Sequence, residues 1–207
     1  MSKIVVWDTE TQGLPLFNQP SEHPDQPHIV QIGACLVDTD DWKTLATIDV
    51  MCKPEGWTIP DDVAAIHGIT TEMAGDLGVP ESLAVEMLLD LIGERLMVGH
   101  NLPFDIRMVR IACMRYFEPA QTEAWAERKY ECTQALSTPI LKLPPTAKMK
   151  AAGRHHHKNA NLGEAFEFFT GRKLEGAHSA LVDVHACMAV YRAIKEGRGR
   201  AVEPLAA

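Results

Sequence analysis

The sequence lacks long hydrophobic runs, and none of its 207 residues belongs to an uninterrupted apolar stretch near the roughly 20 residues of a membrane-spanning helix. Its start, MSKIVVWDTE, lacks the hydrophobic core and cleavage site of a secretory signal, so we expect a cytoplasmic protein. With 46% hydrophobic and 23% charged residues, the chain is neither disordered nor collagen-like. We expect one folded domain over residues 1–197 and a flexible tail over 198–207, where periodicity is lost.

Cysteine pairs and excess positive charge are also missing. The five cysteines are widely spread and form no C-x-x-C pair, which argues against a structural zinc site and a disulfide framework. We expect reduced, mostly buried thiols. The formal net charge of −8 argues against a protein that coats long nucleic acid by general attraction. This net charge is compatible with an enzyme that binds only the end of a nucleic-acid strand.

The order of strand and helix patterns predicts an α/β fold. Short apolar or β-rich runs predict strands at residues 3–8, 28–38, 42–53 and 95–99. Helical spacing of apolar residues predicts helices at residues 61–66, 80–93, 104–116, 161–171 and 179–196. A Pro- and Gly-rich loop separates the first two strands. We therefore predict a mixed β-sheet, first an antiparallel meander and then parallel strands, flanked by α-helices.

Two acids stand at the end of the first predicted strand. Asp8 and Glu10 are two residues apart, and side chains alternate across a strand, so both carboxylates point to the same face. Two adjacent anions need a cation, and carboxylates with no neighbouring His or Cys suit a hard ion such as Mg²⁺ or Mn²⁺. Taken alone, the D-T-E triplet also fits a strand end whose acids are merely solvated.

Three more residues draw attention by their positions. Asp105 lies in VGHNLPFD, where a predicted strand is followed at once by a helix start. Asp183 lies inside the last predicted helix, and His178 lies on the loop before it. Taken singly, Asp105 fits an ordinary first-turn acid favoured by the helix dipole, and His178 fits a surface residue. Their combination with Asp8 and Glu10 is what points to a site.

The segments D-x-E, H-N-x-x-F-D and H-x-A-x-x-D occur in this order, each on a suitable element. In this the chain resembles the DnaQ-like, or DEDDh, family of 3′-to-5′ exonucleases, which have a ribonuclease-H-like fold. The resemblance runs from about Lys3 to Ile194 and includes weaker matches at residues 28–37, at IHGIT in 66–70 and at Asn161-Leu162. It implies that residues 1–197 form an exonuclease domain.

The resemblance also implies a catalytic site with two Mg²⁺ or Mn²⁺ ions. In it His178 is the general base, and the metal-binding carboxylates are Asp8, Glu10, Asp105 and Asp183. Two divalent ions about 3.5–4 Å apart stabilise both the attacking and the leaving oxygen of a displacement at phosphorus, and a histidine titrating near neutrality removes the proton. The implied reaction is hydrolysis at single-stranded 3′ ends, DNA favoured, releasing nucleoside 5′-monophosphates.

Substrate contacts follow from the same resemblance. It implies that the terminal nucleotide meets the backbone around Thr9 and the side chain of Leu14, with His67, Asn101 and Phe104 near the base or sugar. An apolar side chain that stacks on the last base is a usual way of holding a single strand. Leu14 and Phe104 also fit the hydrophobic core, and both interpretations stay open at this point.

Residues 142–158 depart from the acidic average. They contain no Asp or Glu, and their positive or titratable side chains are Lys142, Lys148, Lys150, Arg154, His155, His156, His157 and Lys158. One interpretation places this segment at the edge of the active site, where it neutralises phosphates upstream of the scissile bond. The other is a solvated loop with no role in binding.

Other functions share much of this pattern. A non-cleaving subunit that binds 3′ ends or accompanies a polymerase keeps the same fold, although it has no need of His178. An oligoribonuclease-type RNA exonuclease and an endonuclease keep the same metal chemistry. Spacing does not separate DNA from RNA, because recognition of the 2′-hydroxyl depends on the shape of the pocket. A homodimer is equally open.

Overall fold

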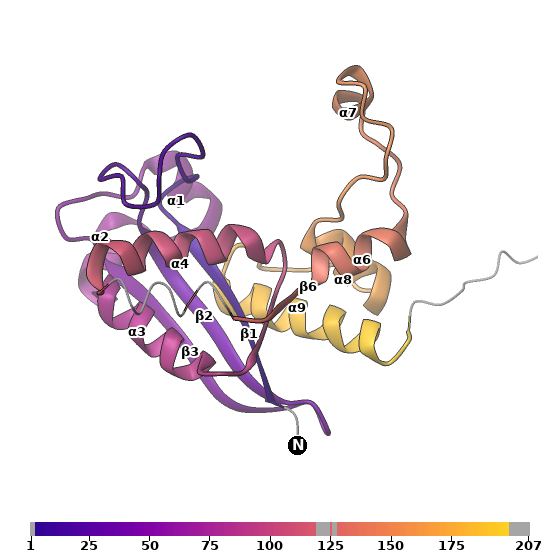
Figure 1. Ribbon diagram of the computed structural model, residues 1–207, viewed down its shortest axis with the longest axis horizontal. Helices are drawn as coiled ribbons and strands as arrows, with labels where there is room; N and C mark the ends of the chain where they lie inside the picture. Colours follow the sequence, from indigo (N-terminus) through magenta and orange to yellow (C-terminus); the bar gives the residue numbers. More distant parts are fainter. Residues whose placement is uncertain (1–2, 119–124, 126–127, 199–207) are drawn as a thin grey trace, which may run out of the picture.

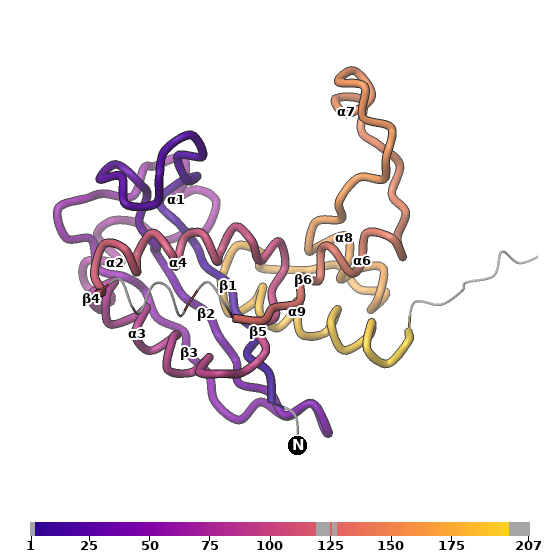
Figure 2. The backbone as a smooth tube through the Cα atoms, viewed as in Figure 1, coloured from indigo at the N-terminus to yellow at the C-terminus, as the bar shows by residue number. Residues whose placement is uncertain are grey.

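The computed structural model describes residues 3–118, 125 and 128–198. Within these residues six strands form one mixed sheet, in the order β4-β3-β2-β1-β5-β6, which can be followed in Figure 2. Their bounds are Lys3–Thr11 for β1, Ile29–Asp38 for β2, Lys43–Lys53 for β3, Val79–Pro80 for β4, Leu96–Gly99 for β5 and Tyr130–Cys132 for β6. The pairs β1–β2 and β2–β3 are antiparallel, and β1–β5 and β5–β6 are parallel. The predicted meander followed by parallel strands is confirmed.

Strand β1 is central, as its continuous apolar run predicts. Its side chains alternate between two hydrophobic cores, with Val5 and Trp7 in one and Ile4 and Val6 in the other. All four are buried. The sequence predicts that this strand ends at Asp8. In the structure it is longer, because its pairing with β2 continues to Thr11.

Helices cover both faces of the sheet (Figure 1). Helices α3 (Glu81–Ile92) and α4 (Leu102–Tyr116) pack on the face of Val5 and Trp7. Helix α9 (Ala180–Lys195) packs on the opposite face, where Val184, Cys187 and Tyr191 meet Ile4 and Val6. Helices α8 (Leu162–Thr170) and α6 (Thr133–Leu141) pack beside α9.

Leu83, Met87 and Leu91 recur at a spacing of four and predict a helix at the right place, but the first two do not face the core. Leu83 and Met87 are 43% and 39% exposed. The buried stripe is formed instead by Ala84, Leu88 and Ile92. The helix is apolar on more than one side, so periodicity locates it without fixing its orientation.

Among the described residues, several short elements have no counterpart in the sequence-based prediction. Helix α1 (Asp61–His67) is predicted, but α2 (Thr71–Leu77), α6, α7 (Ala147–Ala151), β4 and β6 are not. Strands of two or three residues are too short to show alternation, and α6 contains Pro139, which disfavours a helix interior. The Pro- and Gly-rich loop between β1 and β2 is confirmed and extends over residues 12–28.

Residues 142–158 form a projection that we call the basic arm. It leaves the body after α6, carries α7 near its outer end and returns to α8 (Figure 1). The backbone N–H of Lys158 donates to the carbonyl of Leu143 at 3.0 Å and joins the two legs of the arm near its base. Thr146 caps α7 by accepting from Met149 N at 3.2 Å.

Other expectations have mixed outcomes. All five cysteines are free thiols, four of them buried and Cys132 half-buried, as predicted. In the part of the chain that the structure describes, no helix is long and apolar enough to cross a membrane. The predicted tail falls almost entirely outside the described residues, which end at Arg198.

Candidate active site

Strand β1 brings two carboxylates to the face that α9 covers. Asp8 and Glu10 continue the alternation of Ile4 and Val6, which pack against α9, so both carboxylates point to the α9 side. Both side chains are only partly exposed. The extension of β1 to Thr11 places Glu10 inside the strand, and this fixes the common direction of the two acids.

Asp105 reaches the same end of β1 from the opposite face. It lies in the first turn of α4 and is 3% exposed. Its Oδ1 accepts from the backbone N–H of Thr9 at 3.1 Å and from the Thr9 hydroxyl at 2.7 Å. Thr9 points to the α4 side because it alternates with Asp8. In this structure Thr9 therefore positions a carboxylate, and its N–H is already used.

Asp183 comes from the first turn of α9, which begins after the N-cap residue Ser179, close to the predicted start. Its Oδ2 accepts from His178 N at 3.2 Å, and its Oδ1 is buried without a hydrogen-bond partner among the described residues. Gln31 of β2 ties down this end of α9, because its Oε1 accepts from Ala180 N at 3.2 Å. The sequence gives Gln31 only as part of a weak match and assigns it no function.

Gly33 allows the start of α9 to lie directly on the sheet. It pairs with Asp8 in the β1–β2 ladder. A Cβ atom at this position would lie 2.6 Å from the carbonyl carbon of Ala180 and 2.7 Å from Leu181 N, which is closer than real Cβ atoms come to other atoms. Only glycine brings the helix that carries Asp183 so near to Asp8.

We expect Gly33→Ala to lower the free energy of unfolding by about 1–3 kcal/mol and to slow hydrolysis, because α9 must move away from β1. Urea denaturation and an oligonucleotide digestion assay measure the two effects. Gly75→Ala is the matched control, since a Cβ there meets nothing within 4 Å and alanine favours the helix. Wild-type stability and activity in Gly33→Ala would show that this contact does not position Asp183.

The four carboxylates repel one another. Burial raises the pKa of Asp8 well above its usual value, and the other three acids raise it further. Burial, followed by Asp183 and Asp105, raises the pKa of Glu10 to about 7. Burial also raises the pKa of Asp105 to about 7, against the hydrogen bonds from Thr9, and it raises the pKa of Asp183. Negative charge is therefore costly here without a cation.

The donor set fits a divalent metal ion. Four carboxylates offer oxygen ligands of the kind that Mg²⁺ and Mn²⁺ prefer. The buried Oδ1 of Asp183 lacks a partner among the described residues, as expected for an atom aimed at a ligand. In addition, ligand atoms of Glu10, Asp183 and His178 all lie within 4.8 Å of one another. The tertiary structure thus places the imidazole of His178 beside two of the carboxylates.

His178 is exposed and stands on the loop before α9 with a positive φ of 69°. This conformation is uncommon for a residue other than glycine and occurs often at functional sites. Burial lowers the pKa of His67, and the nearby His178 lowers it further. His67 is 9% exposed, its Nδ1 accepts from Ile69 N at 3.1 Å, and its buried Nε2 has no hydrogen-bond partner in the described part of the chain.

The structure decides which proposed substrate contacts belong to the core. Leu14 is 72% exposed in the loop after β1 and is not a core residue. Phe104 is partly buried and packs against the core beneath α4. Asn101 is exposed and adopts a left-handed φ of 59° immediately before α4. The neighbouring His100 is buried, and its ring nitrogens contact Thr133 Oγ1 at 2.9 Å and the Ala160 carbonyl at 3.0 Å.

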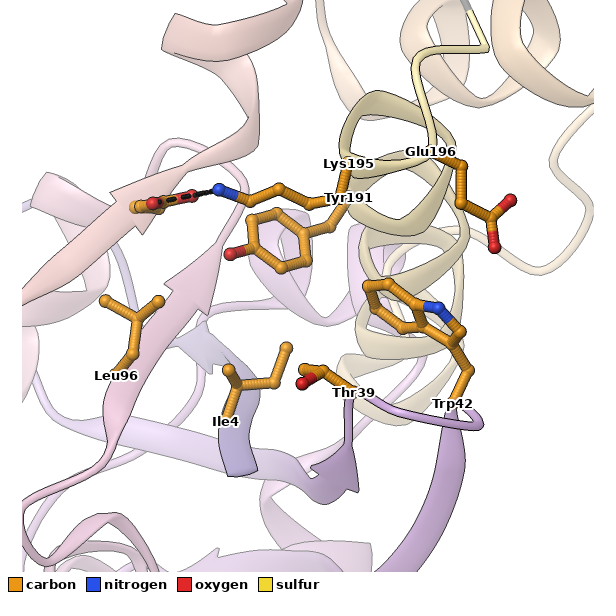
Figure 3. A pocket seen from close by; sticks show the side chains of 8 residues that line it. Ile4, Thr39, Trp42, Leu96, Tyr191, Lys195 and Glu196 are labelled. Atoms are coloured by element: carbon orange, nitrogen blue, oxygen red, sulfur yellow. Dashed lines mark hydrogen bonds and ion pairs between the residues drawn. The ribbon is translucent and has the colours of Figure 1, made fainter. Parts of the chain in front are cut away.

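A separate cavity of about 480 Å³ lies at the other end of the sheet (Figure 3). Ile4 near the start of β1, Trp42 and Tyr191 contribute to its wall. An ion pair of 2.7 Å between Lys195 and Glu131 borders it. This cavity is thus distinct from the carboxylate site, which lies where β1 ends.

A mixed sheet flanked by helices, with acids converging at the end of its central strand, is the arrangement of a ribonuclease-H-like domain. The family model for the RNase T exonucleases matches residues 5–191. The chain belongs to this exonuclease family, whose members are DnaQ-like proteins and use divalent metal ions.

Solved structures and a curated relative resemble the chain. Escherichia coli Exonuclease I bound to a dT13 oligonucleotide has a TM-score of 0.71 and 19% identity over 94% of this chain. Exonuclease I from Methylocaldum szegediense has a TM-score of 0.71 and 20% identity over 97% of this chain. A Mycobacterium tuberculosis protein named as a bifunctional exonuclease/endonuclease is 26% identical over 88% of this chain.

All three relatives are longer. The match covers 41% and 42% of the two Exonuclease I chains and 26% of the mycobacterial protein. At 19–20% identity, the two structures establish a shared fold for this chain.

Proposed function

We propose that this domain is a metal-dependent 3′-to-5′ exonuclease that releases nucleoside 5′-monophosphates from single-stranded nucleic-acid ends, with DNA as the favoured substrate. The observation that carries the proposal is the convergence of four carboxylates and His178 at the end of β1. The likeness to a protein solved with a dT13 oligonucleotide supports single-stranded DNA as the substrate. Two Mg²⁺ or Mn²⁺ ions, when bound, supply Lewis acidity and charge neutralisation at phosphorus.

The side chains have distinct roles in this proposal. Asp8, Glu10, Asp105 and Asp183 hold the ions, and Thr9 fixes the Asp105 carboxylate from behind. Leu14, exposed in the loop after β1, is free to stack on the terminal base, while Asn101 and His67 face the sugar and base. Phe104 supports the start of α4 from its partly buried position.

His178 is the general base in this proposal. Its exposed imidazole lies within reach of the Glu10 and Asp183 carboxylates, so it can take a proton from the attacking water and pass it to solvent. We expect His178→Ala to lower kcat by about 10²- to 10⁴-fold while the affinity for metal changes little.

The control for this variant is His185→Gln, an exposed histidine on α9. Rates over a range of pH, together with metal titration followed by calorimetry, separate the two roles. A variant at His178 that keeps the wild-type kcat and pH profile would remove the histidine from the mechanism. Equal losses of kcat and of metal affinity would make His178 a metal ligand instead of a base.

Digestion of matched 5′-labelled DNA and RNA oligonucleotides in Mg²⁺ or Mn²⁺ tests the reaction itself. We expect a ladder that shortens from the 3′ end, with EDTA abolishing it. A faster RNA reaction would favour an oligoribonuclease-type enzyme. Cleavage of a circular single strand would indicate an endonuclease, and binding without any cleavage would indicate a subunit that only recognises ends.

A further inference from the structure

The basic arm carries positive charge that the fold does not neutralise. Lys142, Lys148, Lys150 and Arg154 are exposed, and in the described part of the chain none has an acidic partner within 4 Å. Lys158 differs, because it forms an ion pair with Glu164 of α8. Four free cations thus project from a protein whose formal net charge is −8. Like charges repel, so this arrangement suits an anionic partner.

The arm is anchored to the segment that enters the active site. Ala160, two residues after the arm, is buried, and its carbonyl accepts from His100 Nε2 at 3.0 Å. His100 directly precedes Asn101, and Asp105 follows in the first turn of α4. The returning leg of the arm is therefore tied to the segment that leads into α4 and Asp105.

A groove connects the two regions. It has a volume of about 520 Å³, and its lining includes Asn101, which directly precedes the helix that carries Asp105. It ends at the returning leg of the arm, and its lining includes Tyr130, Gln134, His156, His157 and Asn159. Tyr130 is 47% exposed and offers a face on which a base can stack. Two of the lining residues are joined by a hydrogen bond, in which Asn159 Nδ2 donates to Gln134 Oε1 at 3.3 Å.

We propose that the basic arm binds the sugar–phosphate backbone of the substrate strand on the 5′ side of the terminal nucleotide, with the intervening nucleotides lying in this groove. The proposal rests on the function proposed above and extends it to the length of strand that the enzyme holds. Lysine and arginine side chains bind backbone phosphates without regard to sequence, and aromatic stacking tolerates every base. The partner is single-stranded nucleic acid, DNA or RNA.

The test compares two triple variants with equal loss of charge. The arm variant is Lys148→Ala, Lys150→Ala, Arg154→Ala. The control is Lys3→Ala, Lys43→Ala, Arg110→Ala, in which all three side chains are exposed and none lines the groove. Lys3 and Lys43 stand at the starts of β1 and β3, which run in the same direction, so they lie at the end of the sheet opposite to the carboxylates, and Arg110 stands within α4.

Fluorescence anisotropy measures binding of 12-nucleotide oligo(dT) and oligo(rU) in EDTA, which prevents hydrolysis. At 50 mM salt we expect the arm variant to bind at least about tenfold more weakly, with the slope of log K against log salt reduced by about 2. The control should change affinity less than twofold. Hydrolysis of a trinucleotide in Mg²⁺ should stay at the wild-type rate in both variants, because a trinucleotide is too short to occupy both the site and the arm.

The outcomes separate the two proposals. Unchanged affinity and salt slope in the arm variant, or an equal loss in the control, would overturn the role of the arm while leaving hydrolysis intact. A wild-type protein that cleaves nothing, but whose binding depends on the arm, would contradict the proposed exonuclease and leave the arm as a nucleic-acid contact. If the arm variant loses affinity for only one of the two oligonucleotides, the arm binds strands with that sugar, deoxyribose or ribose.

Discussion

Replacing Asp8 by asparagine should lower the hydrolysis rate by at least about 10³-fold and at the same time raise the melting temperature of the metal-free protein. The rate falls because an amide is neutral and binds a divalent cation poorly. The stability rises because Asp8 is partly buried beside three other carboxylates, and its charge is a net cost when no cation is present. Opposite effects on activity and stability are the signature of a functional cluster.

The same repulsion predicts how stability depends on pH. Glu10 and Asp105 have folded-state pKa values of about 7, above their ordinary values of 4.5 and 3.8. The folded protein therefore keeps protons that the unfolded chain releases. The stability that this contributes is complete below about pH 4 and is lost as the pH rises to about 7. In EDTA the melting temperature should be lower at pH 8 than at pH 5, and Asp8→Asn should reduce the difference.

Thermal unfolding with and without Mg²⁺, at both pH values, measures these effects. Asp90→Asn, which removes an exposed carboxylate on α3, is the control and should change neither the rate nor the pH dependence. A metal-free Asp8→Asn protein that melts below the wild type would show that the acids do not repel in the folded state. Retention of full activity would exclude Asp8 from the metal site.

Replacing Glu81 by alanine should cost about 3–5 kcal/mol of unfolding free energy, the largest stability effect that we expect. Glu81 is 2% exposed at the first position of α3. Its carboxylate accepts from Ile29 N at 2.8 Å, from the Tyr116 hydroxyl at 2.7 Å and from Arg115 at 3.3 Å. His28 Nδ1 lies 2.6 Å away. Removing the carboxylate leaves a guanidinium partly buried with fewer acceptors, and a buried N–H unpaired.

Urea denaturation at constant pH measures this cost. Glu81→Gln should lie between alanine and the wild type, because it keeps a carbonyl acceptor but loses the charge. Glu86→Ala on the exposed side of the same helix is the matched control and should stay within about 0.5 kcal/mol of the wild type. A Glu81→Ala protein with an unchanged urea midpoint would mean that Arg115 and Tyr116 find other partners at no cost.

The sequence predicts the long elements well, because burial leaves a periodic signal in them. The apolar run of β1 identifies a central strand, and the Asn161 capping box, with Glu164 N donating to Asn161 Oδ1 at 2.8 Å, marks the start of α8. Short elements leave no such signal. Strand β6 exists because it pairs with β5, and nothing in its three residues specifies that neighbour.

The residues of the candidate site likewise divide into those with a signal in the sequence and those without one. Order and spacing along the chain single out Asp8, Glu10, Asp105, His178 and Asp183. The residues that hold them in place have no local signal. Glu81 has the sequence pattern of an ordinary acid in a first helical turn, and the role of Thr9 depends on a partner 96 positions away.

By itself, then, the sequence determines the class of fold, the family and the chemical nature of the acids, since these follow from residue types, local periodicities and the order of motifs along the chain. Only the tertiary structure decides that α9 lies close enough on Gly33 for Asp183 to approach Asp8, and that Leu14 is exposed. It also decides that Lys158 pairs with Glu164, while the other arm cations have no acidic partner among the described residues. These features depend on contacts between distant segments, whose geometry is set by packing and is not encoded in any single stretch of the chain.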